Sequence, residues 1–237
     1  MNNNDFRYMR RGKQLADLAV SEIPLLQAIN QRGSGKKRAL LALHGFSSSP
    51  AVYRYLLPHL KNYDAIICPA LPGHGESIAA FSQASAAEWL AAVSSICETL
   101  ITEYQQVDVL GLSLGGLLAC KLSERFTLNH LYLLAPALKL KLNVNRMCQL
   151  AQCLHWLGFQ QLRNAAGNLI SNEHAEIAYK KLPINTIIEM LKLAKNNQWI
   201  APQCPVDLFL GFHDLIVSSA EVEKLFLPLP HATIHWL

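Results

Sequence analysis

The chain has 237 residues, of which 51% are hydrophobic and 16% charged. Soluble domains usually carry about 25% charged residues, so this composition predicts a large interior relative to the surface. No apolar run reaches the roughly 18 to 20 residues that a membrane span needs. The net charge of +4 is too small and too dispersed to indicate nucleic-acid binding. The length fits one large α/β domain or two small ones, and an enzyme built on a β-sheet is the leading class.

The first 37 residues form a segment of their own before the clearest strand patterns. Residues 15–29 follow a basic stretch and superficially resemble a signal peptide, but Asp17 and Glu22 interrupt them and no small-residue cleavage site follows. They are therefore predicted to form an amphipathic helix on the domain. Peripheral membrane binding by this helix is a minor alternative. The six cysteines include no CxxC pair, which favours a reduced, cytoplasmic protein.

Apolar runs and helical patterns alternate from residue 38 onward. The runs are nearly continuous, as expected for parallel strands that are covered on both faces. This order predicts an α/β fold with a doubly wound, mostly parallel sheet. The predicted strands are residues 38–43, 65–70, 107–112, 130–135, 206–212 and 232–237, and the predicted helices are residues 51–60, 86–104 and 114–125.

Residues 139–203 interrupt this alternation, because they contain no convincing strand. They are predicted to be a helical cap inserted into a core made of residues 38–138 and 204–237. The alternative is two longer crossover helices. Thr186 and Glu189 have the spacing of a capping box at the start of the second helix. The apolar stripes are Met147, Leu150, Leu154 and Leu157 in the first helix, and Ile184, Ile187, Ile188 and Leu191 in the second.

Gly111-Leu112-Ser113-Leu114-Gly115-Gly116 joins the predicted strand 107–112 to the predicted helix that follows it. This is the G-x-S-x-G pattern of a nucleophile elbow, in which glycines flank a serine on a strained turn. The pattern alone is weak, but between a strand and a helix it is specific. Ser113 is therefore the predicted nucleophile.

His44-Gly45-Phe46 ends the strand 38–43 and supplies a second element. A turn at this place presents backbone N–H groups toward the nucleophile, so those of Phe46 and Leu114 are the predicted oxyanion hole. His44 is expected to be a hydrogen-bonding residue under the loop rather than a base.

Asp214 is the third candidate, because it alone among the six aspartates directly follows a strand. Carboxyl ends of parallel strands are where α/β sheets place their sites. A carboxylate there can orient a histidine and stabilise its imidazolium. The alternative is a turn or capping aspartate.

These pieces together resemble the α/β-hydrolase superfamily, and within it the bacterial carboxylesterase and monoacylglycerol-lipase branch with a small cap. Further matches are Leu71-Pro72-Gly73-His74-Gly75, residues 133–137 and residues 211–214, so the resemblance covers about residues 38 to 237. It implies hydrolysis of a small-molecule carboxylic ester by serine, histidine and aspartate, without metal or organic cofactor. His74 and His213 fit the role of base poorly.

The resemblance implies that the base follows the last strand of the core, in the order Ser, Asp, His. Only His231 and His235 follow Asp214, and both lie at or within that strand. The expectation is that the catalytic histidine and a final covering helix lie beyond Leu237, so that the fold is cut short after the last core strand. Recruitment of His235 by local rearrangement is the alternative.

Other functions stay open at this point. The chain could be a catalytically impaired remnant, or the same elbow could serve thioesters, lactones or peptides. A dinucleotide-binding domain is disfavoured because G-x-G-x-x-G is absent. Acyl-chain preference and oligomeric state do not follow from the sequence.

Overall fold

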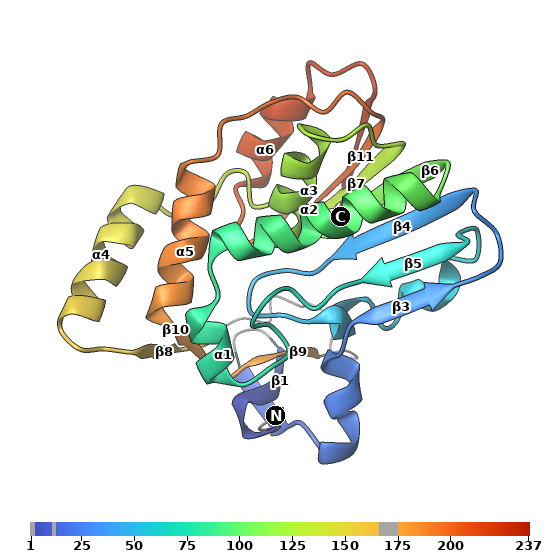
Figure 1. Cartoon of the computed structure of the whole chain (residues 1–237). Helices are drawn as coiled ribbons and strands as arrows, with labels where there is room; N and C mark the ends of the chain where they lie inside the picture. The colour runs from blue at the N-terminus through green and yellow to red at the C-terminus, as the bar shows by residue number, and fades with distance from the viewer. Residues whose placement is uncertain (1–2, 11–12, 166–174) are drawn as a thin grey trace.

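A computed structural model describes residues 3–10, 13–165 and 175–237 (Figure 1). Its central sheet has seven strands in the order β12-β11-β7-β6-β4-β5-β3. Neighbouring strands pair in parallel except at β3, which runs antiparallel to β5. This confirms the predicted α/β class with a mostly parallel sheet. The strands are β3 (Ile29–Arg32), β4 (Arg38–Leu43), β5 (Ala65–Cys68), β6 (Gln106–Leu112), β7 (His130–Leu134), β11 (Val206–Leu210) and β12 (Ala232–Trp236).

The main core lies between one face of this sheet and the helices α2 (Ala86–Glu103), α3 (Leu114–Ser123) and α6 (Ser219–Phe226). A smaller core lies on the other face, under two short 3-10 helices at Pro50–Tyr53 and Leu57–His59. Residues 51–60 were predicted to form one helix. Pro58 lacks the N–H that an α-helix needs there, so two short turns form instead.

The second face is covered only in part. Tyr132, Leu134 and Phe209 on β7 and β11 are half-buried and line an open groove of about 430 Å³. The other side of the groove is lined by residues 56 and 59–63, in and around the second short helix and the loop that follows it. Among the described helices, none is both long and apolar enough to cross a membrane.

The interval 139–203 contains the two helices that the apolar stripes predict, α4 (Val144–Trp156) and α5 (Ile184–Lys195). The expectation that it lacks strands is wrong, because it also forms β8 (Gln161–Arg163), β9 (Glu176–Tyr179) and β10 (Lys181–Pro183). β8 and β10 pair with each other.

The predicted capping box at the start of α5 is also wrong. Pro183 is the N-cap of this helix, and no side chain caps it. The buried Thr186 hydroxyl instead donates to the carbonyl oxygen of Phe81 at 2.9 Å, which ties α5 to α1 (Ile78–Gln83).

The N-terminal segment is not the predicted helix. It forms β1 (Phe6–Arg10), β2 (Lys13–Asp17) and a 3-10 helix at Val20–Leu26 that contains Pro24, and then β3. β1 pairs with β2 on one side and with the distant β9 on the other. Residues 1–2, 11–12 and 166–174, which belong to the predicted N-terminal segment and cap, lie outside the described residues.

Candidate active site

Ser113 lies at the junction of β6 and α3, with φ at 51° and ψ at −109°. A non-glycine residue in this region costs about 1–3 kcal/mol and persists only where its surroundings enforce it. The Ser113 N–H donates to the carbonyl oxygen of Leu134 at 2.9 Å, and its carbonyl oxygen accepts from the N–H of Ala137 at 2.9 Å. The end of β7 therefore holds the strained turn in place.

The flanking glycines explain why the turn can form. A Cβ atom on Gly115 would lie 2.0 Å from the carbonyl oxygen of Leu43, and one on Gly111 would lie 2.4 Å from that of Gly115. A Cβ on Gly116 would approach the side chain of Pro136 to 2.7 Å. The start of α3 thus packs directly against strand ends, and only glycine fits there.

The loop after β4 lies against this turn. An ideal Cβ on Gly45 would be 3.6 Å from the Cβ of Ser113, which makes the two segments neighbours. Within the described part of the chain, no hydrogen bond uses the backbone N–H of Phe46 or of Leu114. Two unpaired donors beside a serine are the arrangement that an oxyanion needs.

His44 lies beneath this loop and is fully buried. Its Nε2 accepts a hydrogen bond from the N–H of Leu71 at 3.0 Å, and its Nδ1 lies 2.9 Å from the carbonyl oxygen of Gly45. Burial lowers the pKa of His44 to about 4. The ring is therefore neutral near pH 7 and joins two loops, in keeping with the structural role that was expected.

Acidification should weaken the fold through His44. Its pKa is near 6.5 in the unfolded chain and about 4 in the folded protein. Between these values the unfolded state binds more protons, so stability that is present above pH 6.5 is lost as the pH falls toward 4. The shift corresponds to about 3 kcal/mol.

Urea unfolding of the wild type and of His44→Asn at pH 7 and pH 4.5 measures this contribution. The wild type should lose more free energy of unfolding between the two pH values than the variant does. Equal losses in both proteins would contradict the assignment to His44.

Asp214 lies in the turn that follows β11. Its Oδ1 accepts hydrogen bonds from the N–H groups of Ile216 and Val217, both at 2.8 Å. Its Oδ2 has no hydrogen-bond or ion-pair partner among the described residues. The residue lines a cavity of about 320 Å³ that Leu134 also lines, and the carbonyl of Leu134 holds Ser113. Ser113 and Asp214 therefore lie at the same edge of the sheet.

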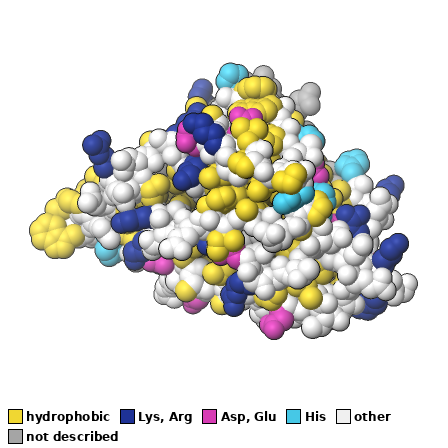
Figure 2. Space-filling view, turned by 90° about the horizontal axis from the view of Figure 1, so that it is seen from above, with side chains coloured by type: hydrophobic (Ala, Val, Ile, Leu, Met, Phe, Trp, Pro, Cys, Tyr) yellow, Lys and Arg dark blue, Asp and Glu magenta, His cyan; other side chains and the backbone are white. Residues whose placement is uncertain are grey.

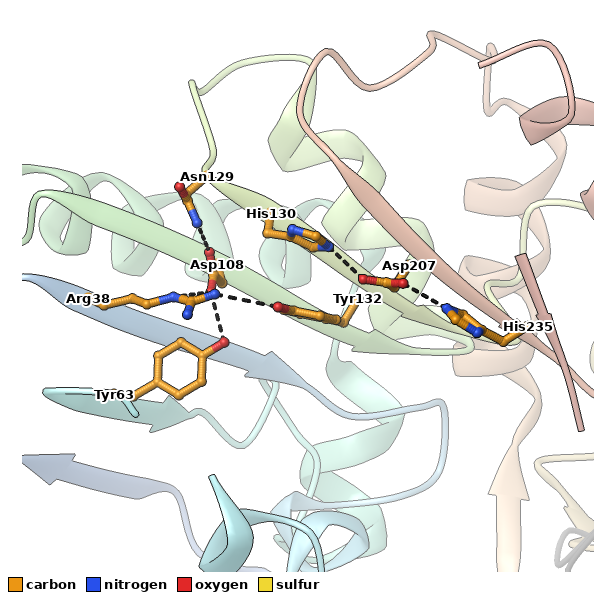
Figure 3. A network of polar contacts seen from close by, with 8 residues as sticks. All are labelled: Arg38, Tyr63, Asp108, Asn129, His130, Tyr132, Asp207 and His235. Atoms are coloured by element: carbon orange, nitrogen blue, oxygen red, sulfur yellow. Dashed lines mark hydrogen bonds and ion pairs between the residues drawn. The ribbon is translucent and has the colours of Figure 1, made fainter. Parts of the chain in front are cut away.

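His235 does not join this arrangement. Its Nε2 lies 2.7 Å from Oδ1 of Asp207, whose Oδ2 is 2.8 Å from Nε2 of His130 (Figure 3). The imidazole also stacks on Phe209, with ring centroids 4.5 Å apart. Asp207 lies near the start of β11, whereas Asp214 follows its end. The contacts of His235 thus give no support to its recruitment as the base.

The other candidate histidines are hydrogen-bonded to backbone carbonyl groups or exposed to solvent. His231 has its Nε2 2.9 Å from the carbonyl oxygen of Pro202, and His213 is exposed on the turn. His74 is buried, with Nδ1 3.3 Å from the carbonyl oxygen of Pro72, and its burial lowers its pKa well below the usual value. Among the described histidines, none is hydrogen-bonded to or ion-paired with the carboxylate of Asp214.

Tyr179 supports the loop next to the site, although no pattern in the sequence points to it. Its hydroxyl donates to the carbonyl oxygen of Gly73 at 2.8 Å and accepts from the N–H of Glu76 at 3.2 Å. The short strand β9 that positions it is recognisable only through its pairing with β1. Tyr179 thereby holds the loop 71–75 in place, although it is 106 residues after Gly73 in the sequence.

Comparisons with known proteins agree with this architecture. A family model described as the alpha/beta hydrolase family matches residues 40–214. The thermostable monoacylglycerol lipase of Bacillus sp. (strain H-257) is 23% identical over 191 residues, which are 79% of this chain and 74% of the relative.

Two solved structures have the same fold. One is reported for LipS and LipT, two metagenome-derived lipolytic enzymes, with a TM-score of 0.78 at 20% identity. The other is the monoacylglycerol lipase of Paleococcus ferrophilus, with a TM-score of 0.68 at 19% identity. Each comparison covers 90% of this chain and 88% of the other. Because the family model spans most of the chain, the protein belongs to the alpha/beta hydrolase family.

Proposed function

We propose that the protein is a serine hydrolase of carboxylic esters, of the carboxylesterase or monoacylglycerol-lipase type. The observation that carries this proposal is the strained turn at Ser113, which lies beside the unpaired N–H groups of Phe46 and Leu114. A relative and a structural neighbour that are monoacylglycerol lipases support the substrate class.

The proposed reaction has two halves. Ser113 Oγ attacks the ester carbonyl while a histidine accepts its proton, and the N–H groups of Phe46 and Leu114 stabilise the oxyanion. Collapse expels the alcohol, which takes the proton from the histidine, and leaves an acyl-enzyme. Water, deprotonated by the same histidine, then releases the acid. Asp214 orients the histidine through its unpaired Oδ2.

The base in this proposal is a histidine outside residues 1–237. The contacts of His231 and His235 argue for this, because each ring is hydrogen-bonded away from Asp214. In the serine protease subtilisin, loss of the catalytic histidine costs roughly 10⁶ in kcat and leaves about 10³–10⁴ over the uncatalysed rate. Residues 1–237 alone should therefore turn over very slowly.

The chemistry proposed here needs no metal ion or organic cofactor. The six cysteines are unpaired, and five of them are buried, which fits a reduced cytoplasmic compartment. The small-molecule ester is the only partner that the mechanism requires.

Paired substrates test the reaction class. The chain continued past Leu237 is assayed on a p-nitrophenyl ester, a glyceryl monoester and a thioester of the same medium-length acyl group. We expect turnover of both oxygen esters, abolished by Ser113→Ala and unchanged by the control Ser123→Ala at the other end of α3. A preference for the thioester would favour a thioesterase, and hydrolysis that survives Ser113→Ala would overturn the proposal.

A further inference from the structure

The loop between β4 and the 3-10 helix Pro50–Tyr53 contains a strained residue directly after the proposed oxyanion donor. Ser47 has φ at 60°, a conformation that a non-glycine residue keeps only where its surroundings enforce it. It is bonded to Phe46, whose backbone N–H is one of the two donors in the proposed oxyanion hole. A change of φ at Ser47 would displace Phe46. The contacts that hold Ser47 therefore also determine where the Phe46 N–H points.

Every hydrogen bond of Ser47 in the described part of the chain joins it to the cap (residues 139–203). Its hydroxyl accepts from the side-chain amide of Asn164 at 3.3 Å, and its carbonyl oxygen accepts from the N–H of Tyr179 on β9 at 3.4 Å. The same Asn164 amide donates to the carbonyl oxygen of Tyr179 at 2.8 Å. These hydrogen bonds connect the three residues in a closed cycle, and Asn164 supplies both of its side-chain links.

The cycle is buried. Ser47, Asn164 and Tyr179 are 3%, 2% and 0% exposed. Water cannot easily replace a hydrogen bond at such a place, so a polar group that loses its partner there carries the full cost of desolvation. Removal of the Asn164 amide would leave the carbonyl oxygen of Tyr179 and the hydroxyl of Ser47 short of a partner. The strained conformation of Ser47 would then lose one of its two attachments to the cap.

Asn164 lies where the cap meets the core, and its backbone is fixed independently of its side chain. It directly follows β8, and its N–H donates to the carbonyl oxygen of Lys180 at 2.9 Å. Gln14 on β2 donates to the same carbonyl oxygen at 2.9 Å. Figure 2 shows that the end of the molecule occupied by α4 in Figure 1 projects from the body as a narrow lobe. A residue held at the junction with the body can position the loop at Ser47, whereas the projecting end cannot.

We propose that Asn164 is a positioning residue, supplied by the cap, that holds Ser47 in its strained conformation and thereby aims the Phe46 N–H at the oxyanion. This inference rests on the proposed function, in which that N–H stabilises the charge formed when Ser113 attacks an ester. Donors to an oxyanion act mainly in the transition state, so a misplaced donor lowers kcat and leaves KM little changed. Asn164 acts through Ser47 and needs no contact with the substrate.

Kinetics of the chain continued past Leu237 test the effect on catalysis. Asn164→Ala should lower kcat on the p-nitrophenyl ester about tenfold and leave KM within about twofold. This loss is smaller than the roughly 10²–10³ expected for a missing oxyanion donor, because the Tyr179 N–H still holds Ser47. The rate of phosphonylation of Ser113 by a fluorophosphonate should fall by the same factor. The double variant with Ser47→Ala should be no slower than Asn164→Ala alone, since the asparagine acts through the serine.

Thr186→Val is the matched control. It also removes a buried hydrogen bond by which the cap is joined to the core, from the hydroxyl to the carbonyl oxygen of Phe81. It should lower the free energy of unfolding by a similar amount, because each variant leaves buried polar groups unpaired, while kcat stays within about twofold. A fall of kcat in this control equal to that in Asn164→Ala would assign the effect to a loosened cap and overturn the proposal.

Hydrogen–deuterium exchange of the 237-residue chain tests the hold on the loop without any catalysis. We expect exchange in residues 44–49 to be about tenfold faster in Asn164→Ala than in the wild type, and unchanged in Thr186→Val. Unchanged exchange in Asn164→Ala would overturn the proposal, as would faster exchange together with an unchanged kcat. A continued wild-type chain without Ser113-dependent turnover would overturn the proposed function, and the exchange measurement would still show whether Asn164 holds the loop.

Discussion

Replacing Asp214 by asparagine is expected to lower kcat for ester hydrolysis about 10⁴-fold, as the equivalent change does in a serine protease. The enzyme used is the chain continued past Leu237. An asparagine side-chain oxygen can still accept from the N–H groups of Ile216 and Val217, so the turn should keep its shape. In the proposed mechanism the variant loses the negative charge that holds the base in its productive tautomer and stabilises the imidazolium.

Asp207→Asn is the matched control, because both aspartates belong to the segment around β11. Asp207 accepts from two histidines and lies away from Ser113, so its substitution should change stability while leaving kcat within about twofold. Steady-state kinetics with thermal unfolding of both variants separates the two roles. Equal kcat in Asp214→Asn and the wild type would remove Asp214 from the mechanism.

Gly115→Ala should destabilise the protein by at least about 3 kcal/mol. The added Cβ would lie 2.0 Å from the carbonyl oxygen of Leu43 and 2.8 Å from that of His44, and both are backbone atoms that cannot rotate away. α3 would have to move off the strand ends. With a typical total stability of about 5–15 kcal/mol, a large share of the fold's stability would be lost.

Gly45→Ala tests whether the loss of stability in Gly115→Ala comes from the close approach of the added Cβ to the backbone. Its added Cβ would meet no atom nearer than 3.6 Å, which is ordinary contact, so stability should change by no more than about 1 kcal/mol. Urea unfolding of both variants gives the comparison. Similar stabilities for the two would mean that the elbow does not require glycine at position 115.

The central strands could be predicted because each is a short, buried, apolar run. The predicted strand 38–43 has the same bounds as β4. The turn at Ser113 could be recognised because glycines surround the serine between a strand and a helix. Local sequence decides such features. A turn with no room for a Cβ atom requires glycine beside it, and those glycines can be recognised in the sequence.

The parts that were missed depend on long-range pairing. β1 has two arginines among its five residues and is stabilised by β9, about 170 residues away, where Phe6 is directly opposite Tyr179. Thr186 has the spacing of a capping residue. Its hydroxyl instead donates a hydrogen bond to the carbonyl oxygen of Phe81, which is 105 residues earlier in the sequence. The contact of His235 with Asp207 likewise depends on the parallel pairing of β11 with β12, so the spacing of these residues in the sequence does not reveal it.

The central claim is that Ser113 is a nucleophile whose base lies outside residues 1–237. Intact-mass measurement of labelling by a fluorophosphonate tests it most directly, since phosphonylation of the serine oxygen with release of fluoride needs both the oxyanion hole and a base. We predict negligible labelling of the folded 237-residue chain, stoichiometric labelling of the chain continued past Leu237, and none of its Ser113→Ala variant. Rapid, Ser113-dependent labelling of the 237-residue chain would contradict the account, because a base within that chain would then activate the serine.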